Sequence, residues 1–416
     1  MVRNKIALIH YSYPPVIGGV EFTIKAHAHI LAKNGHRVKI IAGAGEDEKE
    51  SVEVKVMPLL GSLALFDRQL DEKLKRGEVP ERFYKLKNEI LSQLEREIQD
   101  VKVCIIHNVM TMHFNLPFTC ALDELVTRWH ERIRFYFWCH DFSLNNPAYI
   151  KQIPDPEKYP WNLLSKFNRG AGYITISKLR QRQLARLFGV DADTIQVIPN
   201  GIDVQTFLNL SEKIWNLSWD KGFFESELVM FFPSRMLRRK NYELGIRVLS
   251  EMKKRGKKCK FVITAPPDPH NPEAAKYLDY LHSLSRKLRV EEEVIFLYEL
   301  KEDYNLKLDY QEIKDFYSVC DVLFITSIQE GFGIPLLEAG LKRLPIVCTN
   351  IEPLLEIVGD HALKIDLKDL IPAVAEKIIS YVESSPTVKM FKRVVARYSW
   401  EAIYRNYLKK LVNENA

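Results

Sequence analysis

The sequence contains few cysteines, and their arrangement argues against a disulfide-rich or zinc-binding protein. The six cysteines are scattered and no C-x-x-C pair occurs among them. They are Cys104, Cys120, Cys139, Cys259, Cys320 and Cys348, and most of them lie inside apolar runs. This usage is typical of buried, reduced thiols in a cytoplasmic protein, and it argues against both a disulfide framework and a zinc site.

Long apolar runs are also missing. The longest stretch without Asp, Glu, Lys or Arg covers residues 103–122 and includes His107, Asn108 and Pro117, so it does not predict a membrane-spanning helix. The apolar run at 5–9 is too short for the core of a signal peptide. We therefore expect a cytoplasmic protein.

Charge is nearly balanced, with a formal net charge of +6. Within residues 151–200, eight basic residues stand against four acidic ones. This local excess leaves open an anionic acceptor, a peripheral contact with the inner face of a membrane, or only a solvated surface. It does not indicate nucleic-acid binding.

A chain of 416 residues exceeds the size at which one hydrophobic core stops growing, so the length predicts two domains. Short β-rich runs alternate with amphipathic helical segments, a pattern typical of α/β domains with parallel sheets. The predicted strands are 5–10, 37–42, 101–107, 133–139, 172–176, 228–232, 260–263, 293–296, 322–325 and 345–348. The turn residues that end the segment 197–203 mark the expected boundary between the domains.

The dinucleotide fingerprint G-x-G-x-x-G is not completed after the second predicted strand. Gly43 and Gly45 are followed by Glu48 at the position where the pattern needs glycine, which argues against a nicotinamide cofactor. Instead, Gly18 and Gly19 follow the first strand and begin a predicted helix. A diglycine there permits close approach of a phosphate or sugar to backbone N–H groups, or it forms an ordinary turn and cap.

Basic residues follow the strand 228–232. Arg235 and Lys240 lie at a strand end beside the next helix start, where their charge and the helix dipole would together neutralise a diphosphate. The alternative is that Arg235 and Lys240 are ordinary basic residues on the protein surface. Arg238 and Arg239 are expected to face solvent.

Two carboxylates flank a glycine turn in the segment Q-E-G-F-G-I-P-L-L-E-A-G, residues 329–340. Glu330 precedes the turn and can accept hydrogen bonds from sugar hydroxyls. Glu338 falls about one turn into the predicted helix, where it can hold a vicinal diol such as a ribose. Taken singly, acidic residues at a helix start are also explained by the helix dipole.

The segment E-G-F-G-I-P-L-L-E-A resembles the E-x7-E motif of the family 4 retaining glycosyltransferases, which have the GT-B fold. Four further segments agree with that family: V-I-P-N-G-I-D at 197–203, the R-x4-K of Arg235 and Lys240, P-L-L-E-I-V-G-D at 353–360, and Y-S-W-E at 398–401. The resemblance implies two Rossmann-like domains facing across a cleft. They would be an acceptor-side domain at 1–203 and a nucleotide-sugar domain at 204–395, with a terminal helix at 396–416 that returns to the first domain.

The resemblance also assigns roles to residues. Glu330 would hold the donor sugar, with the backbone of Phe332 and Gly333 beside it, and Glu338 would bind the ribose. Further contributions would come from the cations Arg235 and Lys240 at the leaving diphosphate, from Gly18 and Gly19 approaching it from the other domain, and from His140 near the reacting sugar. The expected catalytic residues are Glu330, His140, Lys240 and Arg235.

The activity implied by the resemblance is transfer of a hexose, with retention, from a nucleotide diphosphate sugar of the GDP-mannose or UDP-glucose type. The acceptor would be a hydroxyl of a small molecule, a glycan or a lipid-linked molecule. We expect neither a metal nor a cofactor besides the donor, because the D-x-D at 191–193 has the character of a turn. The loops at 264–270 and 298–299 lack the family's usual glycines, so the nucleobase is not assigned. The alternatives are an epimerase or phosphorylase of the same fold, or a non-catalytic sugar-nucleotide or polysaccharide-binding protein.

Overall fold

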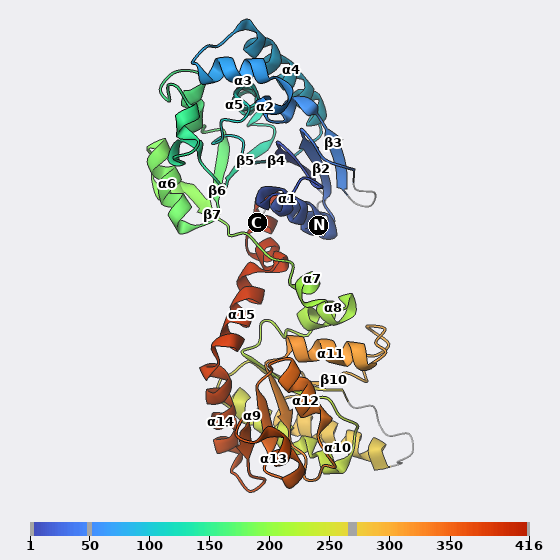
Figure 1. The fold of residues 1–416 in the computed structure, drawn as a ribbon. Coiled ribbons are helices and arrows are strands. Elements are labelled where there is room, and N and C mark those ends of the chain that lie inside the picture. Colours follow the sequence, from blue (N-terminus) through green and yellow to red (C-terminus); the bar gives the residue numbers. More distant parts are fainter. Residues whose placement is uncertain (1–3, 48–51, 265–272, 414–416) are drawn as a thin grey trace. The chain divides into compact units, whose positions relative to one another are not determined.

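The computed structural model describes residues 4–47, 52–264 and 273–413. Contacts divide the chain into two compact units, which are treated separately below (Figure 1). Unit 1 combines the residues up to Asp203 with those from Tyr398 onward, and unit 2 is Val204–Arg397. Each unit contains its own parallel sheet with its own hydrophobic core.

The sheet of unit 1 has, within the described residues, seven strands in the order β3-β2-β1-β4-β5-β6-β7. All neighbouring pairs are parallel. The order reverses at β1 and β4, where Ile6 pairs with Val38 on one side and Val103 on the other. The strands are β1 Lys5–His10, β2 Arg37–Ala42, β3 Val52–Val56, β4 Val103–His107, β5 Arg134–Cys139, β6 Ala171–Thr175 and β7 Ile195–Val197.

Both faces of this sheet are covered, as the near-continuous apolar strands require. Successive side chains of β1 enter different clusters: Ala7 and Ile9 lie in one, and Ile6 and Leu8 in the other. The first cluster includes residues of α2 (Leu63–Phe66), α3 (Arg68–Lys75), α4 (Glu81–Glu97), α5 (Leu116–Trp129) and α6 (Lys178–Phe188). The second includes residues of α1 (Gly19–Lys33) and of the terminal segment.

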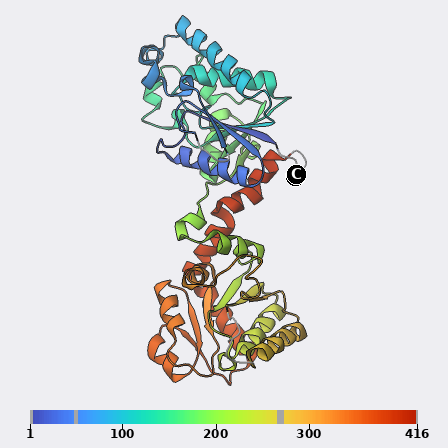
Figure 2. The ribbon, with the colours of Figure 1, turned by 90° about the vertical axis from the view of Figure 1, so that its right-hand side faces the viewer.

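The terminal segment packs on unit 1, which confirms the expected return of the chain to its first domain (Figure 2). This segment follows α15 (Pro386–Tyr398). It consists of α16 (Trp400–Ile403), a π-helical stretch (Tyr404–Leu408) and α17 (Lys409–Val412). The carbonyl oxygen of Val412 accepts from Asn4 Nδ2 at 2.6 Å and from an Arg134 nitrogen at 3.2 Å. The backbone N–H of Ile202 donates to the carbonyl of Tyr398 at 2.7 Å.

Unit 2 contains a second parallel sheet, with six strands in its described part, in the order β10-β9-β8-β11-β12-β13. Here the order reverses at β8 and β11. The strands are β8 Leu228–Phe232, β9 Cys259–Ile263, β10 Val294–Phe296, β11 Val322–Ile325, β12 Ile346–Thr349 and β13 Leu363–Ile365. The predicted fold class, two parallel α/β domains, is confirmed.

Helices of unit 2 surround this sheet, and every residue of β8 and β11 is buried. Helix α9 packs against α14 and α10, whereas α11 packs against α8 and α12. The helices are α7 Val204–Leu208, α8 Glu212–Asp220, α9 Tyr242–Lys254, α10 Glu273–Leu288, α11 Tyr310–Val319, α12 Ile334–Leu341, α13 Glu352–Val358 and α14 Ile371–Ser384.

The structure also shows the state of the cysteines and the apolar length of the helices. All six cysteines are buried and carry free thiols. Among the described helices, none is both long and apolar enough to cross a lipid bilayer.

Candidate active site

In an open parallel sheet, ligands bind beyond the carboxyl ends of the strands where the strand order reverses. In unit 2 this point lies between β8 and β11. The loop after β8 carries Arg235 and Lys240, and the loop after β11 carries Glu330, Phe332 and Gly333. The topology therefore brings together residues that are separated by about ninety positions in the chain.

Lys240 and Glu330 form an ion pair at this point. Lys240 Nζ lies 2.5 Å from Glu330 Oε1, and the two side chains are only 11% and 10% exposed. The backbone around them is tied across the two loops, because Thr326 Oγ1 donates to the Lys240 carbonyl at 2.9 Å. The low exposure leaves the attraction within this pair less screened by solvent than in a surface ion pair, and the contact holds both groups in place before any ligand arrives.

Two further groups hold the Glu330 carboxylate. Ser327 Oγ donates to Oε1 at 2.6 Å, and an Arg239 nitrogen lies 3.3 Å from Oε2. Burial acts to raise the pKa of Glu330, but the hydrogen bonds from Lys240 and Ser327 and the two nearby cations outweigh it. The pKa therefore lies below its ordinary value, and the carboxylate is ionised at neutral pH.

Arg239 is exposed to solvent, as expected, but its side chain also takes part in the site. Its guanidinium contacts Glu330 and also donates to the carbonyl of Gln329 at 2.9 Å. Arg238, by contrast, lies over the ring of Tyr277. The side chain of Arg235 is exposed, and its carbonyl oxygen accepts from the Tyr242 hydroxyl at 3.0 Å.

The glycine turn leads directly into α12. Gly333 caps this helix with a φ of +114°, a conformation that strains other residues, and an added Cβ would lie 2.8 Å from Leu354 Cδ2. Helix α12 begins at Ile334, so Pro335 occupies its second position, one later than expected. Pro335 has no N–H, and the Leu336 N–H donates to the carbonyl of Gly333 at 2.9 Å, which leaves the N–H of Ile334 at this helix start to bind an anion. Phe332 beside it is 56% exposed.

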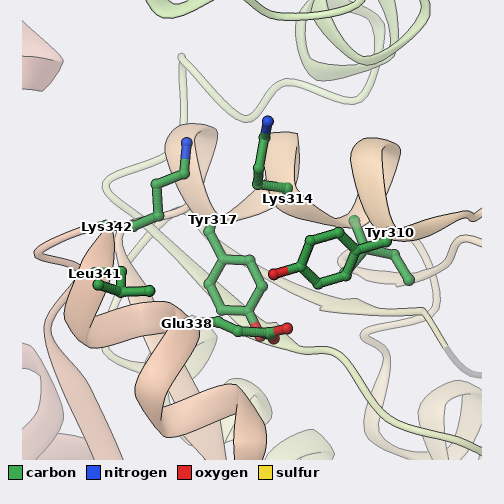
Figure 3. Close-up of a pocket in the computed structure, with 7 residues that line it drawn as sticks. Tyr310, Lys314, Tyr317, Glu338, Leu341 and Lys342 are labelled. Carbon is green, nitrogen blue, oxygen red and sulfur yellow. The ribbon is translucent and has the colours of Figure 1, made fainter.

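Glu338 lies in α12, as expected, and lines a pocket of about 150 Å³ between α11 and α12 (Figure 3). Tyr317 donates its hydroxyl to Glu338 Oε2 at 2.5 Å. Burial, and then the Glu338 carboxylate, raise the pKa of Tyr317, which keeps this hydroxyl protonated. The rings of Tyr310 and Tyr317 lie beside the carboxylate, whereas the ammonium groups of Lys314 and Lys342 point away from it (Figure 3).

In unit 1, Gly18 and Gly19 begin α1 after β1, as predicted. Gly18 is the N-cap, and a Cβ there would lie 2.0 Å from Glu21 Oε2, whereas a Cβ on Gly19 would meet no atom within 4 Å. The Glu21 carboxylate also accepts from Ser12 Oγ at 2.7 Å and lies 3.8 Å from His10 Nε2. Burial opposes its ionisation, but His10, Ser12 and its own backbone N–H lower the pKa of Glu21 to about 2.

His140 follows β5 at the same edge of unit 1 and is buried. Its backbone N–H and that of Asp141 both donate to Asn108 Oδ1, at 3.1 and 2.9 Å. Its ring Nε2 lies 3.5 Å from Nδ1 of His107, the last residue of β4. Burial, and then the neighbouring His10, lower the pKa of His140 to about 3, so its ring is neutral at pH 7.

The structure thus joins Lys240 to Glu330 within unit 2 and places Glu338 in an adjacent pocket. Gly18, Gly19 and His140 belong to unit 1. Sequence reasoning assigned no role to Ser327, Tyr317 or His107, because a single hydroxyl or ring carries no local signal of the group that it contacts. Asp191 accepts a hydrogen bond from the backbone N–H of Asp193 at 2.9 Å, which is turn geometry. Most of the loop at 264–270, expected near the nucleobase, lies outside the described residues.

Two family models match this chain. The model described as Glycosyltransferase Family 4 matches residues 17–206, and the model described as Glycosyl transferases group 1 matches residues 213–396. Together they cover nearly all of both units. The chain belongs to glycosyltransferase family 4, and its two α/β units are the Rossmann-like domains of the GT-B fold. It is a glycosyltransferase.

The chain is similar to several known proteins. An uncharacterized glycosyltransferase from Methanocaldococcus jannaschii is 27% identical over 85% of this chain and 82% of its own length. A mannosylglucosylglycerate synthase from Thermotoga maritima is 23% identical over 84% of this chain and 81% of its own. A solved glycosyltransferase from Rickettsia africae aligns over the full length of both chains, with 16% identity and a TM-score of 0.37.

Proposed function

We propose that this enzyme transfers a hexose from a nucleotide diphosphate sugar, of the GDP-mannose or UDP-glucose type, to a hydroxyl acceptor with retention of anomeric configuration. The observation that carries the proposal is the buried Lys240–Glu330 pair at the reversal point of the unit 2 sheet. A cation and a carboxylate held side by side match the two chemically different halves of such a donor, its diphosphate and its sugar.

The diphosphate would bind at the cationic end of this arrangement. Lys240 is fixed by the two loops, Arg235 is exposed after β8, and the N–H of Ile334 at the start of α12 can face an anion. Charge on the departing diphosphate would thereby be stabilised in a preorganised setting, which is the largest catalytic effect available to such a site.

The hydroxyl groups of the donor would bind the carboxylates. Glu330, with the backbone of Phe332 and Gly333 beside it, would accept from the sugar. Glu338 would accept from the ribose through Oε1 and through the lone pair of Oε2 that Tyr317 does not use. The exposed ring of Tyr310, which lines the same pocket, would provide an apolar surface for the rest of the nucleoside.

Given the proposed retention, the way in which Glu330 is held argues against a covalent intermediate on its carboxylate. Both of its oxygens face cations and one also accepts from Ser327, which makes the carboxylate a poor nucleophile. We therefore place the acceptor's attack on the same face as the departing diphosphate, with the cations stabilising the leaving group. In unit 1, Gly19 and Gly18 would contribute at the diphosphate and His140 near the reacting sugar.

The names of two relatives support a hexose as the transferred group. The Thermotoga maritima protein is a mannosylglucosylglycerate synthase, and a relative from Salmonella typhimurium, 23% identical over 55% of this chain, is an O-antigen chain mannosyltransferase. The acceptor would be a small molecule, a glycan or a lipid-linked molecule. For a lipid-linked acceptor, the basic excess at 151–200 would support a peripheral membrane contact.

We further propose that the reaction needs no metal, because Lys240, Arg235 and the helix N-terminus supply the positive charge. Transfer should then proceed at the same rate with and without a strong chelator. Activity that is lost in chelator and restored by Mg²⁺ or Mn²⁺ would refute metal independence while leaving glycosyl transfer intact.

The proposed function is tested by incubating the protein with a panel of nucleotide sugars and candidate acceptors and following release of nucleoside diphosphate. We expect release with a GDP-linked or UDP-linked hexose and an α-linked product from an α-linked donor, as read by NMR coupling constants. Product of inverted configuration would contradict retention. Tight binding with no release for any donor and acceptor would contradict the proposed reaction.

A further inference from the structure

His107 has no role in the proposed function, yet its ring is the neighbour of His140. It ends β4, its side chain is completely buried, and its Nδ1 lies 3.5 Å from Nε2 of His140. No sequence pattern distinguished it from an ordinary apolar strand residue.

The His107 ring is held in place from several sides. Its strand runs between β1 and β5, and its carbonyl oxygen accepts from Nδ1 of His10 at 2.7 Å. The ring stacks on the indole of Trp138, with centroids 5.4 Å apart and an interplanar angle of 22°. His140 is fixed as well, through the Asn108 side chain that binds its backbone N–H. The contact between the two rings is therefore a rigid feature of this edge.

The two facing nitrogens, 3.5 Å apart, are within hydrogen-bonding distance, and such a bond needs one hydrogen atom between them. Burial, and then the charges of nearby histidines, keep His107 neutral at pH 7, and His140 is neutral too. A neutral imidazole carries a single N–H, so one ring donates and the other accepts.

The other nitrogen of His107 decides which ring donates. Nε2 is buried and has no hydrogen-bond partner among the described residues. An unpartnered buried N–H is rarer than an unpartnered acceptor. The hydrogen atom of His107 therefore belongs on Nδ1, His140 Nε2 accepts it, and the single N–H of His140 is at Nδ1.

We propose that His107 is a positioning residue that fixes His140 in the Nδ1–H tautomer, so that His140 can donate a hydrogen bond from Nδ1 to a sugar hydroxyl during transfer. This inference rests on the proposed function, which places His140 near the reacting sugar. Without His107, His140 would exchange between its two tautomers and present a donor for only part of the time.

Two substitutions of similar polarity separate this role from a structural one. In His107→Asn the side-chain amide reaches the position of Nδ1 and can still donate to His140, whereas in His107→Gln it reaches the position of Nε2 and cannot. We expect kcat within about threefold of the wild type for Asn and at least about tenfold lower for Gln, the effect of losing one oriented hydrogen bond. Both variants should fold and keep the wild-type nucleoside diphosphate affinity. Equal kcat values for the two folded variants would overturn the proposal, as would full activity of His140→Ala.

The tautomer itself can be observed without turnover. In protein labelled with ¹⁵N-histidine, the signals of His140 are identified by their loss in His140→Asn. We expect an Nδ1–H ring in the wild type and in His107→Asn, and mixed tautomers in His107→Gln. An Nε2–H ring in the wild type would overturn the assignment. If the wild type transfers no sugar, the proposed function fails, and this spectrum still decides the tautomer.

Discussion

Gly18 and Gly19 are adjacent, but they differ in what surrounds their α-carbons. The ionised Glu21 carboxylate, itself held by Ser12, lies against Gly18, while the space above Gly19 is open. Glycine at position 18 is therefore explained by the chain's own carboxylate. At position 19 no contact within the fold requires glycine, but a ligand that approaches the backbone there would require it.

This difference gives a matched pair of variants. Gly18→Ala should lower Tm, because the new Cβ displaces Glu21 from Ser12 and His10 at a cost of about 1–3 kcal/mol. Gly19→Ala should leave Tm unchanged and weaken donor binding, since only the ligand's approach is obstructed. Thermal unfolding and donor titration of both proteins are the measurements. Unchanged donor affinity in Gly19→Ala would remove Gly19 from the proposed site.

At the level of single residues, the sequence predicted Lys240 and Glu330 as parts of one site, because each follows a strand and the strands are parallel. It could not predict that they bind each other, or that Arg239 joins them. The direction of a side chain within a loop depends on contacts such as that between the Ile328 N–H and the Arg239 carbonyl, 89 positions apart. No local pattern encodes such contacts.

At the level of elements, α11 and α12 together form the pocket around Glu338. If Glu338 binds a ribose diol, Glu338→Gln should bind the nucleoside diphosphate about 10-fold more weakly, because a charged acceptor is lost. It should also lose most of the discrimination between ribose and 2′-deoxyribose forms. Calorimetry with both nucleotides measures this.

Tyr317→Phe is the companion variant for this pocket, because it keeps the ring and removes only the hydroxyl that orients Glu338. A smaller loss, about 2–10-fold, is expected for the ribose nucleotide. If Glu338→Gln still prefers the ribose form as strongly as the wild type does, Glu338 does not bind the diol.

The central strands could be predicted well from sequence, and the edge strands could not. β1, β2, β8 and β11 have the predicted bounds, because they are apolar on both faces. β3 and β13 were missed. β3 is Val-Glu-Val-Lys-Val, with four of its residues exposed or partly exposed to solvent on a sheet edge, and β13 has three residues, of which only Ile365 is buried. Such strands form because a neighbouring strand is there to pair with.

For the whole molecule, the buried histidines of unit 1 make stability depend on pH. Burial lowers the pKa of both His27 and His140 to about 3. In the unfolded chain they protonate near 6.5, so between about 6.5 and 3 the unfolded state binds more protons. The free energy of unfolding should therefore be greatest above about pH 7 and should fall with acidification, by up to about 1.4 kcal/mol per pH unit for each histidine.

Urea unfolding of the whole chain at pH 7.5, 6 and 5, followed through a unit 1 probe, measures this dependence. His27→Leu is the matched control: it replaces a ring whose two nitrogens have no partner in the described structure, so it should flatten the pH dependence. A wild-type midpoint that does not change between pH 7.5 and 5 would contradict the neutral, buried state of these histidines.

The two-unit architecture itself could be anticipated, because the chain is too long for one core and the strand pattern occurs in both halves. The return of the terminal segment to unit 1 came from the resemblance of residues 398–401 to the family. This return has a physical basis, because Ile403, Leu408 and Val412 pack into the hydrophobic core between α1 and the sheet. Local periodicity could predict a helix there, but not the unit to which that helix belongs.

The central claim is that Lys240 binds the diphosphate of the donor and Glu330 its sugar. Lys240→Met and Glu330→Gln keep side-chain volume while removing one charge each. Calorimetry with nucleoside diphosphate, beside transfer rates with nucleotide sugar, separates the roles. We predict that Lys240→Met weakens nucleoside diphosphate about 10–150-fold, the cost of a charged hydrogen bond. Glu330→Gln should bind it within about threefold of the wild type and yet lose most turnover. If both folded variants lose nucleoside diphosphate equally, the assignment is wrong.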